Sequence, residues 1–162
     1  MLVCLMHSAV ARLPESVCVN GNVRYFAFGS NLLRSKMVGC VPTWSAQQPR
    51  VLTDSASGLP RCRRGETGVL DRVPALVRDH RLAFNLRMFP PLEPAMASIE
   101  PSAGDSCEGA LYTLTREGYE ELWRSEGGAM ERPGYEELVV TAEASGESVS
   151  AITLRAASVG KL

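Results

Sequence analysis

Tyr25-Phe26-Ala27-Phe28-Gly29-Ser30-Asn31-Leu32 is the stretch of this sequence that decides the fold. Its first four residues are typical of the interior of a β-strand. Gly29 permits a tight turn with a positive φ, and Ser30 and Asn31 are favoured at the start of a helix. A strand that ends in this way directs backbone N–H groups at open space, which suits an anionic ligand. The residues alone fit a plain strand-to-helix turn equally well.

Composition narrows the class of protein. A chain of 162 residues with 45% hydrophobic content is large enough for one domain with a single core. A net charge of -1 gives no global field that favours nucleic acid or an anionic membrane. The five cysteines are far apart, with neither zinc-site spacing nor a disulfide framework, so we expect reduced thiols and a cytoplasmic protein.

Residues 1–22 are expected to form a disordered leader. Their apolar start is too short for a signal peptide or a membrane span, although a role in organelle targeting is an alternative. The remaining residues, 23–162, are expected to form one domain that contains a long loop at about 41–73, rich in proline and glycine.

The pattern along the domain indicates a mixed α and β structure. Thr115 is a candidate cap for a helix that reaches about Trp123, with Tyr119, Leu122 and Trp123 on one face as core residues. A hairpin is expected at residues 144–147. The other expected elements are strands at 23–28, 75–77, 81–85, 96–99, 109–113, 137–142 and 149–154, a turn at 101–105, a break at 89–92, and a helix at 32–38 closed by Gly39.

Several segments, in order, resemble the γ-glutamylcyclotransferase superfamily. They are the stretch quoted above, residues 95–101 (Ala-Met-Ala-Ser-Ile-Glu-Pro), residues 108–112 (Glu-Gly-Ala-Leu-Tyr), Ser125-Glu126-Gly127, and Tyr135 at the start of a strand. The resemblance covers roughly residues 23–156, with a poor match at about 41–73. It implies an α+β fold, a small mixed β-barrel with short helices.

The resemblance also implies a reaction. Members of this family convert a γ-glutamyl amino acid or γ-glutamylamine to 5-oxoproline and a free amine, without a cofactor or metal. It implies Glu126 as the catalytic acid and base, and a small-molecule substrate rather than a nucleic acid or a membrane. The substrate-binding residues that it implies are Tyr25, Phe26, Ala27, Phe28, Gly29, Ser30, Asn31 and Tyr135.

The choice of glutamate depends on the resemblance. Glu108, Glu117 and Glu126 all precede glycine, and by its residues alone Glu126 fits a solvated helix end. Gly127 and Gly128 allow a sharp turn that would leave the carboxylate of Glu126 accessible. Phe28 departs from the family, since many relatives have tyrosine at this position.

A second class of function stays open. Related chains continue for some tens of residues beyond the position of Leu162 and bring another aromatic group to the pocket, so the resemblance implies a truncated C-terminus. A catalytically impaired relative would act as a small-molecule or protein-binding module. Other catalytic classes have little support in the sequence. The only histidines are His7 and His80, which gives little material for a Ser-His-Asp site, and the sequence has no cluster of metal ligands. The oligomeric state is left open.

Overall fold

The computed structural model describes residues 13–32, 68–86, 96–126 and 134–157. Strand β2 is followed by a 3₁₀ turn, η2, and helix α2 stands between the β3–β4 and β5–β6 strand pairs in the chain. The elements are η1 (Glu15–Val17), β1 (Cys18–Val19), β2 (Asn22–Ala27), η2 (Gly29–Leu32), β3 (Val69–Leu86), β4 (Met96–Leu114), α2 (Arg116–Ser125), β5 (Tyr135–Ala144) and β6 (Glu147–Ala156).

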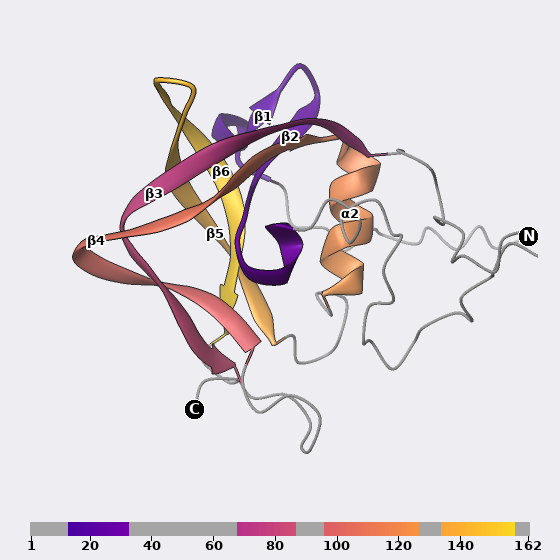
Figure 1. Cartoon of the computed structure of the whole chain (residues 1–162). Coiled ribbons are helices and arrows are strands. Elements are labelled where there is room, and N and C mark those ends of the chain that lie inside the picture. The colour runs from indigo at the N-terminus through magenta and orange to yellow at the C-terminus, as the bar shows by residue number, and fades with distance from the viewer. Residues whose placement is uncertain (1–12, 33–67, 87–95, 127–133, 158–162) are drawn as a thin grey trace, which may run out of the picture.

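The strands form a closed barrel (Figure 1). Their order is β1-β2-β4-β3-β5-β6, and a further pairing of β2 with β6 closes the sheet. Neighbours are antiparallel except β2 and β6, which are parallel at Tyr25 and Ile152. The expected α+β fold, a small mixed β-barrel with a short helix, is confirmed.

Two tight hairpins connect neighbouring strands. Asn20 (φ 50) and Gly21 (φ 78) join β1 to β2, and Ser145 (φ 52) and Gly146 (φ 83) join β5 to β6. Two successive residues with positive φ match the right-handed twist of the flanking strands. The hairpin predicted at residues 144–147 is therefore confirmed.

Three predictions about the segments that form β3 and β4 are wrong. The segments 75–77 and 81–85 belong to one strand, and the expected turn at 101–105 lies inside β4. Pairing shifts from Arg78↔Ser106 to His80↔Pro101, so residues 102–105 bulge opposite Asp79. The amide of Gly104 donates to Asp79 Oδ1 at 2.9 Å, which stabilises this bulge. The loop expected at 41–73 is also wrong for residues 69–73, which begin β3.

The N-terminal boundary of the domain also differs from the prediction. Residues 13–22, expected to be disordered, include η1 and β1, and Leu13 and Val17 are buried in the core. The expected helix at 32–38 with Gly39, the rest of the loop at 41–67 and the break at 89–92 lie outside the described residues, apart from Leu32.

The buried residues form two clusters. One draws on the five strands β2 to β6 and on no helix, so it fills the interior of the barrel; Phe26 and Phe28 belong to it. The other includes Tyr25 and Tyr112 from the barrel and Tyr119 from α2. We call this second group the helix-side cluster. Because successive residues of a strand face opposite sides, β2 contributes to both.

Helix α2 begins as predicted. The Thr115 hydroxyl accepts a hydrogen bond from the amide of Gly118 at 3.1 Å, which satisfies a free donor of the first turn. Tyr119 is fully buried, and Leu122 and Trp123 pack on the helix-side cluster. Figure 1 shows the helix beside the barrel, where it contacts β2 and β4.

Candidate functional site

The η2 turn begins at Gly29, a position that favours glycine. Gly29 has φ 58, a conformation that is strained for L side chains. A Cβ atom at Gly29 would lie 3.0 Å from the Cβ of Ala97 on β4. The strand-and-turn reading of residues 25–32 is confirmed, and Gly29 permits the backbone of the turn to approach β4 closely.

Tyr135, on β5, also contacts β4 at Ala97. It opens β5 as predicted, it is buried, and its hydroxyl donates to the carbonyl of Ala97 at 2.8 Å. Gly29 and Tyr135 are distant in sequence, and both contact Ala97. The structure therefore brings together two of the predicted substrate-binding positions.

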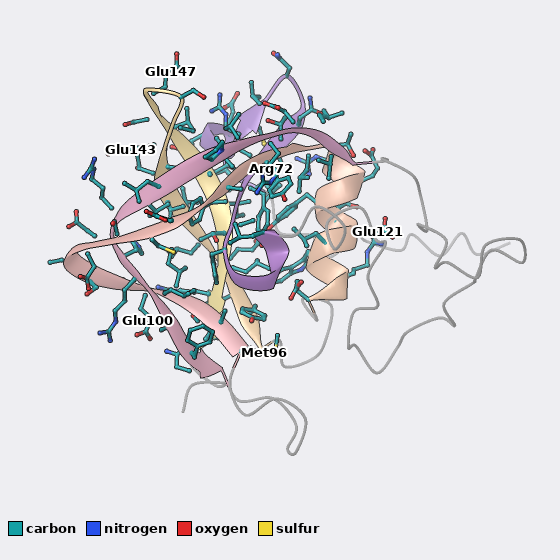
Figure 2. All side chains as sticks on the ribbon, in the orientation of Figure 1. Arg72, Met96, Glu100, Glu121, Glu143 and Glu147 are labelled. Carbon is teal, nitrogen blue, oxygen red and sulfur yellow. The ribbon has the colours of Figure 1, made fainter. Side chains whose placement is uncertain are left out.

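The far end of the η2 turn is also tied to the barrel. The hydroxyl of Tyr112 donates to the carbonyl of Leu32 at 3.3 Å, and Arg72 Nε donates to that hydroxyl at 3.1 Å. The guanidinium lies 5.8 Å from the centre of the Tyr112 ring, within range of a cation–π interaction. Figure 2 shows Arg72 on the side of the barrel where α2 and η2 lie.

Not all the predicted binding residues face the same side. Tyr25, Ala27 and Tyr135 belong to the helix-side cluster, whereas Phe26 and Phe28 point into the barrel. The two phenylalanines therefore support β2 from behind. The backbone of Ser30 and Asn31 lies within η2, and their side chains are outside the described part of the structure.

Glu126 caps the C-terminal end of α2. Its amide donates to the carbonyl of Leu122 at 3.0 Å, and its side chain is half-buried. It follows Tyr119 by seven residues, about two helical turns, so the spacing assigns it to the helix face that packs on the barrel. The other two candidates, Glu108 and Glu117, are exposed.

A buried tyrosine links α2 to β5. The Tyr119 hydroxyl donates to Glu137 Oε1 at 2.5 Å, and its ring centre lies 6.2 Å from that of Tyr25. Burial raises the pKa of Tyr119, and the hydrogen bond to Glu137 raises it further. The phenol is therefore the donor in this bond.

Sequence reasoning missed three side chains in this region: Arg72, Tyr112 and Glu137. Tyr112 lies in a family-like segment whose pattern indicates only a strand, and Arg72 lies in the expected loop. Glu137 is two residues after Tyr135, so alternation along β5 would have assigned both to one face.

A metal site and a separate hollow are less suited than the η2 region to the substrate that the resemblance implies. Among the described residues, no group of three or more His, Cys, Asp or Glu side chains is placed to hold a metal ion. A hollow of about 260 Å³ is lined by Leu76 and residues 143–148, at the opposite end of β5 from Tyr135. Figure 2 shows Glu143 and Glu147 there.

Within the part of the chain that the structure describes, no helix has the length and apolar character needed to cross a membrane.

Comparison with known proteins supports the fold. No family model and no curated protein matches the sequence. A solved structure of a γ-glutamyl cyclotransferase is similar with a TM-score of 0.59 and 17% identity, over 84% of this chain and 67% of that chain. The human uncharacterised protein loc79017 is similar with a TM-score of 0.59 and 18% identity, over 85% of this chain and 68% of that chain. YkqA from Bacillus subtilis is similar with a TM-score of 0.56 and 18% identity, over 84% of this chain and 40% of that chain.

This chain has the γ-glutamyl cyclotransferase-like fold. It spans about two thirds of the length of the first two structures. At these identities the similarity establishes the fold, and the site must be judged from its own geometry.

Proposed function

We propose that this protein is a cofactor-free cyclotransferase, which converts a γ-glutamyl amino acid or γ-glutamylamine to 5-oxoproline and the free amine. The α-amine of the glutamyl group attacks its own γ-carbonyl carbon, which forms a C–N bond. The bond from that carbon to the leaving amine then breaks. In total, the attacking ammonium loses two protons as it becomes the lactam N–H. The departing nitrogen gains two and leaves as an ammonium ion, so the protons balance and the reaction consumes no co-reactant.

Each part of the candidate site has a role in this reaction. Backbone amides of the segment that ends in the η2 turn bind the glutamyl carboxylate or polarise the γ-carbonyl. Tyr135 lines the same side and holds the glutamyl chain in its folded-back conformer. Because both reacting groups belong to one molecule, holding that conformer supplies much of the acceleration.

Glu126 is the proton carrier in this proposal. It accepts a proton from the ammonium and later donates it to the leaving amine, so one carboxylate serves both steps. Its half-buried position at the end of α2 supports this role over Glu108 and Glu117, which are exposed.

One observation carries the proposal: Gly29 and Tyr135 meet at Ala97. A Cβ on Gly29 would lie 3.0 Å from the Cβ of Ala97, and Tyr135 donates to the Ala97 carbonyl. A strand-to-3₁₀ turn beside a fixed aromatic ring is an arrangement suited to a small anionic substrate, and the proposal assigns the carboxylate of Glu126 to this site.

A substrate panel tests the proposal. Purified protein is incubated with γ-glutamyl dipeptides, γ-glutamyl-ε-lysine and glutathione, and 5-oxoproline is measured. Turnover of at least one γ-glutamyl compound is the expected result. Binding of these compounds by calorimetry without any 5-oxoproline would favour the alternative, a binding module that has lost catalysis.

A further inference from the structure

A directed hydrogen bond connects the helix that carries Glu126 to the strand that carries Tyr135. The Tyr119 hydroxyl donates to Glu137 Oε1 at 2.5 Å. Tyr119 is 0% exposed and Glu137 is half-buried. A carboxylate drawn partly out of water is stable only with a well-placed donor, and Tyr119 supplies it.

The two partners share faces with the proposed site. Tyr119 and Glu126 are seven residues apart, which is about 10.5 Å along the helix and nearly the same angular position. Glu137 and Tyr135 are two residues apart in β5, so both side chains project from one face of the strand. The hydrogen bond therefore connects the face of α2 that bears Glu126 with the face of β5 that bears Tyr135.

Three contacts together define where α2 lies. At its start, the Thr115 amide donates to the Gly68 carbonyl at 2.8 Å. Gly118 approaches Gly68 so closely that a Cβ on Gly118 would lie 2.6 Å from the Gly68 Cα. These contacts fix the first turn of the helix in space. The bond from Tyr119 to Glu137 then fixes how the helix is rotated about its axis.

Packing alone would not fix that rotation. Apolar contacts of Leu122 and Trp123 are not directional, and they tolerate small shifts of the helix. One residue corresponds to about 100° around a helix, so even a partial rotation would turn Glu126 away from the barrel. In some proteins a buried polar pair costs stability but specifies a single arrangement.

We propose that Tyr119 and Glu137 are positioning residues, which set the orientation of α2 and thereby hold Glu126 in the position from which it transfers the proton. This inference rests on the proposed function, in which Glu126 carries the proton. Neither residue touches the substrate. Both act through the placement of the helix.

The first arm of the test is kinetic. Tyr119→Phe and Glu137→Ala each remove the bond, and both should lower kcat and kcat/KM together, by about 10- to 100-fold, because small misplacements have effects of that size. KM should stay unchanged. Glu137→Gln retains an acceptor oxygen for the phenol and should keep most of the wild-type rate. The double variant Tyr119→Phe/Glu137→Ala should be no slower than the single variants.

Glu136→Ala is the matched control. Glu136 is the neighbour of Glu137 on the opposite face of β5, and its Oε1 pairs with Arg155 Nε at 2.7 Å. It should leave kcat unchanged. Normal kcat in Tyr119→Phe would overturn the inference, and so would a loss in Glu137→Gln as large as that in Glu137→Ala.

The second arm does not depend on activity. The amide of Glu126 is protected by its bond to the Leu122 carbonyl, and its hydrogen exchange should accelerate in Tyr119→Phe and Glu137→Ala but not in Glu136→Ala. If the wild-type protein turns over no γ-glutamyl compound, the proposed function fails, and this arm alone decides whether the pair positions Glu126. Unchanged exchange in both variants would refute it.

Discussion

Replacing Gly29 by alanine tests the geometry of the η2 turn. Two costs arise from this single methyl group. An L-residue held at φ 58 is destabilised by about 1–2 kcal/mol. The new Cβ also meets the Cβ of Ala97 at 3.0 Å. Since both atoms are fixed by the main chain, only a shift of β4 or of the turn relieves the contact, at about 1–3 kcal/mol.

Gly21 offers a matched control. It has φ 78, and a Cβ there would meet nothing within 4 Å. Gly21→Ala should therefore lose only the conformational part, about 1–2 kcal/mol, whereas Gly29→Ala should lose about 2–5 kcal/mol in total. For a domain of this size, each kcal/mol lowers Tm by about 2–4 °C.

Urea unfolding and calorimetry provide the measurements. Gly29→Ala should have a lower free energy of unfolding than Gly21→Ala. This difference should shrink when Ala97→Gly is added to Gly29→Ala, once the effect of Ala97→Gly alone has been subtracted. The larger Gly29→Val, in folded protein, should abolish binding of a γ-glutamyl ligand. Equal destabilisation at Gly21 and Gly29, together with unchanged ligand affinity in Gly29→Val, would refute the close approach of the turn to β4.

Three further outcomes are expected. Activity should survive exhaustive EDTA treatment, and a loss that zinc or magnesium restores would contradict the cofactor-free mechanism. Cys107, whose thiol pKa is raised by burial and by neighbouring Glu108, should react slowly with a disulfide reagent until the protein unfolds; rapid labelling of native protein would contradict this. The hydrogen bond from Arg78 lowers the pKa of Glu143 from 4.5. The stabilisation that this bond gives the folded protein is therefore present above pH 4.5 and is lost as the pH falls through the lowered pKa. Glu143→Gln should therefore be slightly less stable than wild type at pH 7 and equal to it in acid, and a difference that persists in acid would argue against this bond.

Local signals in the sequence predicted most of the elements correctly. Thr115 marked the start of α2, and the alternation on both sides of residues 144–147 marked the last hairpin. The strand that enters Gly29 was also readable, because short-range preferences and the tertiary structure agree there. The resemblance to a family supplied the barrel.

Non-local contacts explain the errors. Pro101 and Gly104 have the composition of a turn, but their pairing with β3 absorbs the extra residues as a bulge opposite Asp79. Leu13 and Val17 lie in the segment expected to be a disordered leader, and nothing local in the sequence indicates the core that buries them. The meeting of Gly29 and Tyr135 at Ala97 and the bond from Tyr119 to Glu137 join distant residues, and neither has a local pattern.

The central claim is that this protein cyclises a γ-glutamyl substrate with Glu126 as the proton carrier. The most direct measurement is 5-oxoproline formation by wild type and Glu126→Gln, with Glu108→Gln and Glu117→Gln as controls. Glu126→Gln should reduce turnover by about 10²–10⁴-fold with little change in ligand affinity, while both controls stay active. Normal turnover in Glu126→Gln, or an inactive Glu108→Gln, would contradict the account.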